Sequence, residues 1–316
     1  MIAEFIHPLT KATCVGDGQG NLHAGSVVIR SVDSCYDFAH LHDTTRDRAY
    51  YDERYHHCCR IPDPNLSSET LRRLWERDSS STLLYHSAGD LCGKRVLLLG
   101  NGSSLKELRF VEDGAHVIYT DISLEAVLAV KRAYENSPMA RQSRGRIEFH
   151  AVDALHLPFT DNAFDIIYGC ALVHHIQDLD VFFSEVCRCL KTGGRCIFLD
   201  DAYSPIWQLA KKTILRPLQA ISHWRTGISP EDRRATRKGG YRIEELQGIL
   251  TRHGFRHLMY RRTMFLEYLM RRGLAKLLSK GLAAVFAPVG RFIDLRVLGP
   301  RWLKRHGLHL VWGYNK

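Results

Sequence analysis

The sequence predicts an α/β protein built on a doubly wound, mostly parallel sheet. From Lys94 onward, short apolar runs alternate with stretches of helical length and spacing, the pattern of parallel strands connected by helices. The run Val96–Leu99 contains only apolar residues, as expected for a central strand buried on both faces. The 316 residues, 45% of them hydrophobic, fit one large globular domain with appendages and exclude a disordered or collagen-like chain.

The predicted elements follow in a regular order. The expected strands are Val96–Leu99, Val117–Thr120, Ile147–His150, Phe164–Tyr168, Arg195–Leu199, Phe255–Tyr260 and Leu308–Trp312. The expected helices are Glu107–Asp113, Leu124–Tyr134, Asp180–Leu190 and Tyr241–His253. These elements place the main domain at residues 94–316, after a small β-rich unit at 1–40 and a helical cap at 41–93.

Two insertions interrupt the main domain, at about 204–227 and about 265–307. The second begins with a predicted basic amphipathic helix, Phe265–Phe286. Its apolar stripe comprises Leu266, Leu269, Met270, Leu274, Leu277, Leu278 and Val285, and its basic residues are Arg271, Arg272, Lys276 and Lys280. Such a stripe either packs on the domain, leaving the charges in water, or lies in a membrane interface.

Charge is distributed unevenly along the chain. Residues 205–316 contain 23 Lys and Arg against 6 Asp and Glu, whereas the rest contains 21 against 28. The C-terminal third is therefore expected to face something anionic, such as phosphate, a lipid headgroup or nucleic acid, unless the charges are simply solvated.

Localisation and redox state follow from further simple observations. No apolar stretch approaches the ~18 residues of a membrane span. The start of the chain lacks the pattern of a signal peptide. Nine cysteines without a CxxC pair predict reduced thiols in the cytoplasm, and they form no spacing that predicts a metal site.

A glycine turn follows the first predicted strand of the main domain. Gly100-Asn-Gly102 would lie at the carboxyl edge of the sheet, where ligands bind in this fold class. Asp121 follows the next strand at the spacing of a carboxylate that binds ribose hydroxyls. Ser104 and Glu107 match a capping box, which predicts that Ser104 begins the next helix.

A third block makes the pattern specific. Asp153–Asp165 reads D-A-L-H-L-P-F-T-D-N-A-F-D and is followed by the apolar Ile166–Tyr168, then by Val173–His175 and Cys189–Gly194. With the glycine turn, the stretch from about Lys94 to Asp201 resembles the class I S-adenosylmethionine-dependent methyltransferases, especially the ubiquinone and menaquinone biosynthesis branch. The resemblance covers about a third of the chain and implies a Rossmann-like sheet of seven strands.

The resemblance also implies a cofactor site for S-adenosylmethionine. It would place the methionine part on the glycine turn, the ribose on Asp121, the adenine on Asp153 and Ala154, and the sulfonium beside Gly169 and Cys170. The complete implied set is Gly100, Asn101, Gly102, Asp121, Ile122, Asp153, Ala154, Gly169 and Cys170.

Two positions depart from the family pattern. Leu98 stands where the family has an acidic residue near the cofactor's amino group, and Ser104 stands where it has a third glycine. A non-catalytic protein that only binds the cofactor therefore stays an alternative. Tyr51 and Tyr55 would either cover the cofactor from an N-terminal helix or pack in the core.

The first 40 residues resemble, faintly, the Trm112-like zinc ribbon that precedes some of these methyltransferases. His7 and Thr10 stand where that module has cysteines, and Cys14 and Cys35 cannot complete a closed four-ligand site. We therefore expect a remnant without metal.

The predicted reaction is methyl transfer to a small-molecule or lipid-like acceptor. His174 and His175 follow the fourth strand, and Asp200 and Asp201 end the fifth, so all four are expected at the ligand edge. A hydroxyl acceptor needs a proton acceptor, for which His174 is the candidate, so we expect O-methylation.

Several alternatives stay open. Carbon and nitrogen acceptors remain candidates, as does RNA, although the tryptophans form no recognisable stacking platform among the basic residues. A nicotinamide-dependent dehydrogenase would share the glycine turn but would not explain Asp153–Asp165. The basic insertion predicts contact with the anionic inner face of a membrane as a further possibility.

Overall fold

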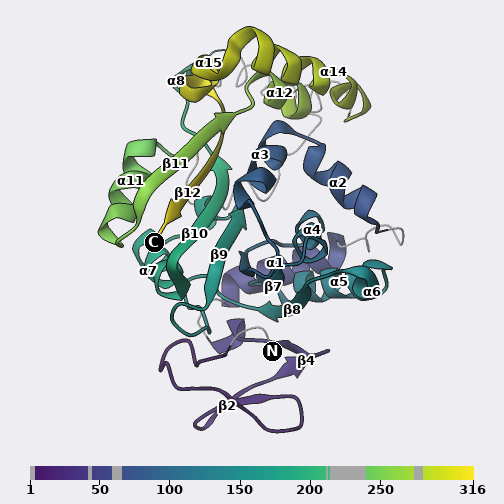
Figure 1. Cartoon of the computed structure of the whole chain (residues 1–316), viewed down its shortest axis with the longest axis vertical. Coiled ribbons are helices and arrows are strands. Elements are labelled where there is room, and N and C mark those ends of the chain that lie inside the picture. The colour runs from purple at the N-terminus through teal and green to yellow at the C-terminus, as the bar shows by residue number, and fades with distance from the viewer. Residues whose placement is uncertain (1–3, 42–44, 59–65, 211–212, 214–239, 274–279) are drawn as a thin grey trace.

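A seven-stranded sheet forms the centre of the molecule in the computed structural model, which describes residues 4–41, 45–58, 66–210, 213, 240–273 and 280–316 (Figure 1). Its strand order is β11-β12-β10-β9-β6-β7-β8. The strands are β6 (Arg95–Leu99), β7 (His116–Asp121), β8 (Arg146–Ala151), β9 (Phe164–Cys170), β10 (Leu190–Asp201), β11 (Arg256–Thr263) and β12 (His309–Asn315).

Six of the seven strands run in one direction, and β12 runs against them. β8, β7, β6, β9 and β10 pair in parallel, whereas β12 is antiparallel to both β10 and β11. The predicted α/β fold with a mostly parallel seven-stranded sheet is therefore confirmed. Since parallel strands end at one edge, the loops after β6, β7, β8, β9 and β10 meet there.

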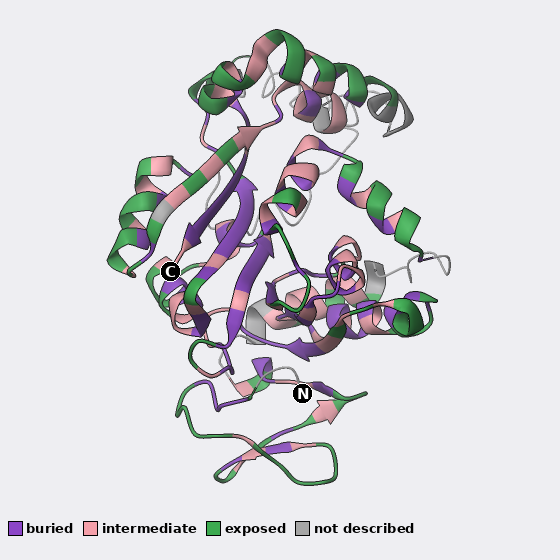
Figure 2. Ribbon diagram, viewed as in Figure 1, coloured by how far each residue is buried: buried purple, intermediate pink, exposed green. Residues whose placement is uncertain are grey.

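The helices of the main domain cover both faces of the sheet. They are α4 (Arg109–Glu112), α5 (Leu124–Glu135), α6 (Met139–Gln142), α7 (Leu179–Cys189) and α11 (Ile243–Arg252). Each face has its own buried cluster, one centred on Phe182, Phe198 and Trp312 and the other on Leu98 and Phe110. Figure 2 shows the central strands as the most continuously buried part of the chain.

The segment after the glycine turn differs from the prediction. Instead of one helix over Glu107–Asp113, a 3₁₀ turn over Lys106–Leu108 leads into the single α-helical turn of α4. Ser104 does not cap this helix, because its hydroxyl donates to the side chain of Glu107 (2.6 Å). The capping-box residues thus meet, but they brace the turn rather than begin a long helix.

Among the described residues before the main domain, the elements are two small sheets, a 3₁₀ turn (Ala39–Leu41) and three α-helices. β1 (Val15–Gly16), β2 (Leu22–Ala24) and β3 (Val27–Ile29) make one sheet, and β4 (Ser31–Val32) and β5 (Cys35–Tyr36) make the other. The helices are α1 (Thr45–Cys58), α2 (Ser68–Glu76) and α3 (Ser79–Ala88).

Aromatic packing fixes the small sheets to the edge strand β8. The ring of Phe5 packs against Tyr36, Phe38, His150 and Phe159 at centroid distances of 5.0–5.8 Å. The backbone N–H of Tyr36 donates to Nδ1 of the buried His150 (3.1 Å), and burial lowers the pKa of this imidazole. The predicted boundaries of the N-terminal unit and helical cap stay predictions.

The two residues at the cysteine positions of the zinc ribbon that the N-terminal segment resembles lie close together. Nδ1 of His7 accepts the backbone N–H of Thr10 (3.1 Å), so the two residues at cysteine positions contact each other. Within the described ranges, no three His, Cys, Asp or Glu side chains are grouped so that they could hold a metal ion. The expectation of a metal-free protein stays a prediction.

A C-terminal cap of helices lies beyond the ends of β10 and β11 (Figure 1). The predicted helix Phe265–Phe286 is described in the structure only in part. Its described parts are α12 (Leu266–Tyr268), a π-helical turn over Leu269–Gly273, and α14 (Lys280–Phe292). A second π-helical turn (Ile293–Leu298) and α15 (Gly299–His306) complete the cap. Leu274, Leu277, Leu278 and Lys276 of the predicted stripe and basic set lie outside the described residues.

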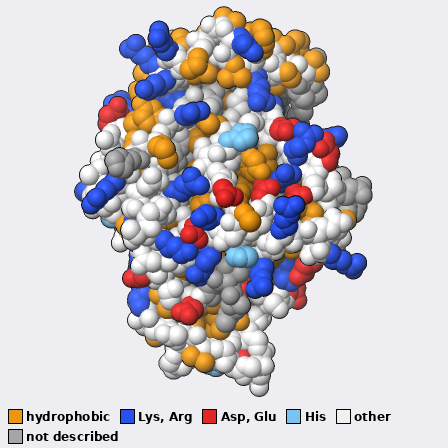
Figure 3. Space-filling view, in the orientation of Figure 1, with side chains coloured by type: hydrophobic (Ala, Val, Ile, Leu, Met, Phe, Trp, Pro, Cys, Tyr) orange, Lys and Arg blue, Asp and Glu red, His pale blue; other side chains and the backbone are white. Residues whose placement is uncertain are grey.

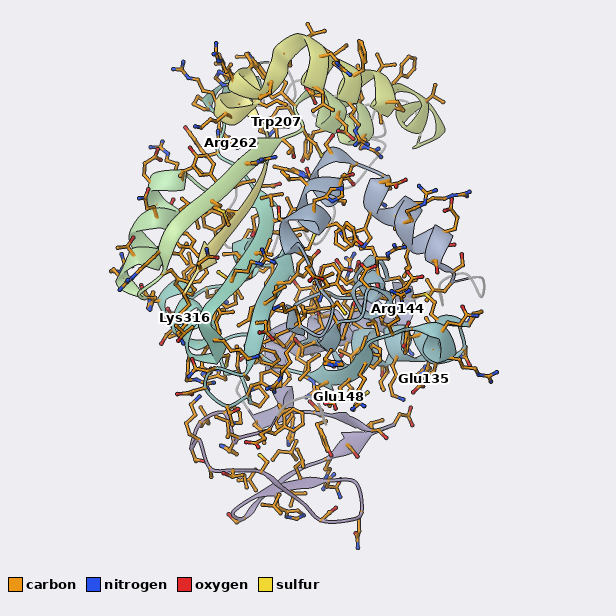
Figure 4. The ribbon with its side chains drawn as sticks, in the orientation of Figure 1. Glu135, Arg144, Glu148, Trp207, Arg262 and Lys316 are labelled. Carbon is orange, nitrogen blue, oxygen red and sulfur yellow. The ribbon has the colours of Figure 1, made fainter. Side chains whose placement is uncertain are left out.

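The first insertion reaches the same cap. Its described part is mainly α8 (Pro205–Ala210), and most of 204–227 lies outside the described residues. Trp207 packs edge-to-face on Tyr268 (centroids 5.6 Å apart), and Arg262 donates to the carbonyl oxygens of Tyr203 and Arg305 (both 2.6 Å). Figure 4 labels Trp207 and Arg262 at this junction. No described helix is long and apolar enough to cross a membrane.

Candidate active site

The side chain of Asp121, the last residue of β7, holds the glycine turn after β6 by hydrogen bonds. Gly100 and Gly102 have φ of 58° and 56°, in the left-handed region that favours glycine. One carboxylate oxygen of Asp121 accepts the N–H of Gly102 (2.6 Å), and the other accepts the N–H of Ser123 (2.9 Å). Burial raises the pKa of this carboxyl to about 6.

The turn leaves polar atoms available for hydrogen bonds to a ligand. A carboxylate offers about four lone-pair positions. The N–H groups of Gly102 and Ser123 occupy two of those of Asp121, and the backbone N–H of Ile122 also lowers the pKa of this carboxyl. Asn101 is 7% exposed, and neither its side-chain oxygen nor its nitrogen has a hydrogen-bond partner among the described residues. Because unpaired buried polar groups are costly, this amide fits a polar ligand beside the turn.

The other implied cofactor residues lie along the same edge. Asp153 is buried after β8, where its carboxylate accepts the N–H of Leu155 (2.9 Å) and lies 3.1 Å from Nδ1 of His156. Ile122 directly follows β7, Ala154 lies three residues after the end of β8, and both are half-buried. Gly169 and Cys170 are the last residues of β9 itself, rather than residues just past it.

A buried carboxylate beneath the turn was not assigned a site role by the sequence. Glu107 is fully buried, and its two oxygens accept the hydroxyls of Ser104 (2.6 Å) and Tyr168 (2.9 Å). The hydroxyl of Tyr119 donates to the carbonyl of Ser104 (2.7 Å). Leu98 lies in the same core cluster as Tyr119 and Tyr168, so an apolar side chain suits its position.

Residues of α1 cover the turn from the other side. A Cβ added to Gly102 would meet the hydroxyl of Tyr55, and this contact together with the positive φ favours glycine here. Asp52 accepts the hydroxyl of Ser123 (2.6 Å), and its negative charge contributes to the raised pKa of Asp121. Tyr51 packs edge-to-face with His175 (centroids 6.4 Å apart).

A histidine–carboxylate pair lies at the ends of β9 and β10. Nδ1 of His174 lies 2.9 Å from an oxygen of Asp200, which also accepts the backbone N–H of His174 (3.3 Å). Burial raises the pKa of the Asp200 carboxyl. The His174 side chain is 20% exposed, whereas that of Asp200 is fully buried. His175 lies beside His174, with ring centroids 4.0 Å apart, and Asp201 is exposed.

The thiol of Cys170 is paired with a cation. Its sulfur lies 3.6 Å from Nζ of Lys106, and burial raises the pKa of the thiol. Nζ of Lys106 also lies over the ring of Trp75, 4.7 Å from its centroid. At the end of β9, a neutral thiol therefore lies beside the positive charge of Lys106.

Comparisons with known proteins agree with this arrangement. Residues 97–198 match the family model Methyltransf_11, a methyltransferase domain. A demethylmenaquinone methyltransferase of Streptomyces avermitilis is 27% identical over 153 residues, which cover 48% of this chain and 60% of the relative. The ubiquinone/menaquinone biosynthesis C-methyltransferase UbiE of Cellvibrio japonicus is 32% identical over 139 residues, covering 43% and 52%. The chain thus spans about half the length of the curated relatives it matches.

Solved structures of methyltransferases are similar to the chain at low sequence identity. Haemonchus contortus phosphoethanolamine N-methyltransferase 2, in complex with S-adenosyl-L-methionine, is 17% identical with a TM-score of 0.49, covering 75% of this chain and 52% of that one. The family match, the strand order and the glycine turn followed by Asp121 point the same way. The chain therefore carries a methyltransferase domain of the class I, S-adenosylmethionine-dependent type.

Proposed function

We propose that the protein transfers a methyl group from S-adenosylmethionine to a small-molecule acceptor, and that His174 takes up the acceptor's proton. The cofactor, when bound, supplies an electrophilic methyl group on a sulfonium. On the chain's side, Asp121 accepts ribose hydroxyls with its remaining lone pairs, and Asn101 pairs with the polar methionine end.

The observation that carries the proposal is the pair between His174 and Asp200 at the ends of β9 and β10. When Nδ1 of His174 donates to the buried carboxylate, Nε2 carries the ring's lone pair and can accept a proton. The carboxylate then stabilises the imidazolium that forms. Proton removal is what a hydroxyl acceptor requires, so O-methylation is the proposed outcome.

Carbon methylation is the second candidate, because the quoted UbiE relative is a C-methyltransferase by name. A ring carbon that has accepted a methyl group must lose its own proton, and the same histidine can receive it. The two outcomes therefore share the base and differ only in the acceptor atom.

The acceptor is proposed to be hydrophobic or lipid-linked, and the protein to work at the cytoplasmic face of a membrane. Two features support this: apolar side chains are exposed on α8 and α14, and the C-terminal third is strongly basic.

The experiment has two steps. First, mass spectrometry of a cell extract incubated with the protein and methyl-labelled cofactor identifies the labelled product and the methylated atom. Second, His174→Ala is expected to lower kcat by about 100-fold or more, the scale of general-base catalysis, with little change in cofactor affinity.

A matched control is available on the surface. Nε2 of His253 lies 2.9 Å from an oxygen of Asp180, the same pairing away from the ligand edge, so His253→Ala should leave kcat unchanged. An unchanged kcat in the His174 variant would remove this residue from the reaction. Absence of any labelled product would favour a protein that only binds the cofactor.

A further inference from the structure

Large apolar side chains face outward along the C-terminal cap. Three of them, Val285, Val289 and Phe292, recur at the spacing i, i+4, i+7, which places them on one side of α14. The most exposed are Val297 (68%), Val285 (67%) and Phe292 (62%). We call the whole set the cap face: Val285, Phe286, Val289, Phe292, Leu295 and Val297.

The opposite side of the same helix is small and tightly packed. Ala287 is fully buried, and a Cβ added to Gly290 would lie 2.8 Å from the backbone nitrogen of Glu267 in α12. Asp294, 1% exposed, accepts the N–H groups of Phe265, Leu266 and Glu267 at 2.9–3.0 Å. The helix therefore buries its small residues and exposes its large ones, the reverse of an ordinary surface helix.

The cap is also fixed to the rest of the molecule. The buried carboxylate of Glu267 accepts the hydroxyl of Ser79 in α3 (2.5 Å) and Nε of Arg271 (3.2 Å). Arg291 of α14 donates to the carbonyl of Glu76 in α2 (3.2 Å). The cap face is thus held by its buried side in a defined position.

Within residues 280–306 the exposed charges have one sign, and an exposed acid nearby is Glu76 of α2, whose carbonyl accepts Arg291. Residues 280–306 contain six Lys and Arg but one acidic residue, Asp294, whose carboxylate is buried on backbone N–H groups. Arg296, Arg301 and Lys304 are exposed. Figure 3 shows hydrophobic side chains gathered at the upper end of the molecule, where Figure 1 places α14 and α15, with Lys and Arg side chains beside them.

We propose that the cap face docks on an anionic lipid bilayer. Exposed apolar side chains in a segment whose exposed charges are all basic match the boundary between acyl chains and anionic headgroups. A second copy of the chain fits less well, because a two-fold contact would oppose Arg296 and its basic neighbours with the same basic set.

The docking surface and the proposed reaction site share one side of the molecule. α8 begins four residues after Asp201, the end of β10, and exposes Ile206 and Leu209. α15 packs against α8. If His174 is the base of the proposed function, on which this step rests, a lipid-linked acceptor could pass from the membrane toward it.

Vesicle flotation with the full-length protein tests the surface. We expect binding to vesicles of phosphatidylcholine with phosphatidylglycerol, little binding to phosphatidylcholine alone, and release as salt rises. Arg296→Glu should weaken binding by about fivefold or more, the equivalent of losing one basic group at an anionic surface. Phe292→Ser together with Val297→Ser should weaken it by about tenfold or more.

Two controls keep the result interpretable. Arg141→Glu changes an exposed arginine on α6, away from the cap, and should bind vesicles like the wild type. Thermal unfolding checks that the cap-face variants remain folded, as expected for exposed positions.

Each outcome decides the proposal. Failure to float with anionic vesicles at low salt overturns it, as does equal binding by the cap-face variants. A dimer that the Phe292 substitution dissociates, without vesicle binding, would assign the face to a second copy. RNA binding that Arg296→Glu abolishes, without vesicle binding, would assign it to nucleic acid. Flotation does not measure methyl transfer, so a failure to float would leave the proposed reaction untouched. Conversely, if His174→Ala loses activity, the variant should still float like the wild type.

Discussion

The turn after β6 and the C-terminal cap both use a buried aspartate to hold backbone N–H groups, but with different results. At the turn, Asp121 accepts two N–H groups and retains lone pairs next to the unpaired amide of Asn101. In the cap, Asp294 accepts three N–H groups and the outer surface is apolar. The same device therefore lies beside unpaired buried polar atoms in one region and beneath an apolar surface in the other.

The largest expected effect comes from replacing Leu98 with the acidic residue that the family usually has at this position. Leu98→Asp should lower the free energy of unfolding by about 3–5 kcal/mol, because it buries an unpaired carboxylate in a core cluster that also contains Tyr168, the partner of Glu107. Urea denaturation measures this loss. Leu98→Met, of similar volume, should cost less than about 1.5 kcal/mol. A stable aspartate variant would contradict the conclusion that position 98 requires an apolar side chain.

The next effect tests the cap. Asp294→Ala should lower the free energy of unfolding by about 2–4 kcal/mol, because three N–H groups at the start of α12 lose their acceptor. Asp294→Asn keeps one acceptor oxygen and should lose about half as much. If both variants unfold like the wild type in thermal denaturation, the cap is held by other contacts and the contrast between the two aspartates fails.

The sequence predicted the sheet and its edge well because those signals are local. All-apolar runs such as Val96–Leu99 have few alternatives to a buried strand, and the positions of Asp121 and Asp153 follow once the strands are placed. The family resemblance supplied the remaining cofactor positions. Sequence spacing also predicted that Ser104 and Glu107 meet, although not in which geometry.

The rest depended on contacts between distant segments. Glu107 is 61 residues from Tyr168, and Asp52 is 71 residues from Ser123, so no local pattern connects them. An apolar stripe at helical spacing ordinarily predicts burial. Only the tertiary structure shows that Ala287 and Gly290 form the packed side of α14 while Phe292 faces outward.

A smaller effect separates ligand binding from folding at the turn. Asp121→Ala should weaken S-adenosylmethionine binding by about 1–3 kcal/mol, the scale of losing charge-assisted hydrogen bonds to two hydroxyls. Isothermal titration calorimetry measures the affinity, and circular dichroism checks the fold. Unchanged affinity in a folded variant would overturn the assignment of this carboxylate, and the two aspartates would then serve structure alone.

The smallest expected effect is a pH dependence of cofactor affinity. Burial, with a contribution from the charge of Asp52, raises the pKa of Asp121 to about 6. Ribose hydroxyls donate most strongly to the ionised carboxylate, so affinity should be full above this pKa and fall as pH drops through it. If only the ionised form binds, the dissociation constant should rise about tenfold between pH 7 and pH 5. Titration calorimetry over this range measures the change.

Asp52→Asn removes a neighbouring negative charge and should shift the midpoint to lower pH, whereas Asp121→Asn should make the affinity independent of pH here. A flat profile in the wild type would mean that Asp121 does not bind the cofactor through its charge, and its role would then resemble that of Asp294.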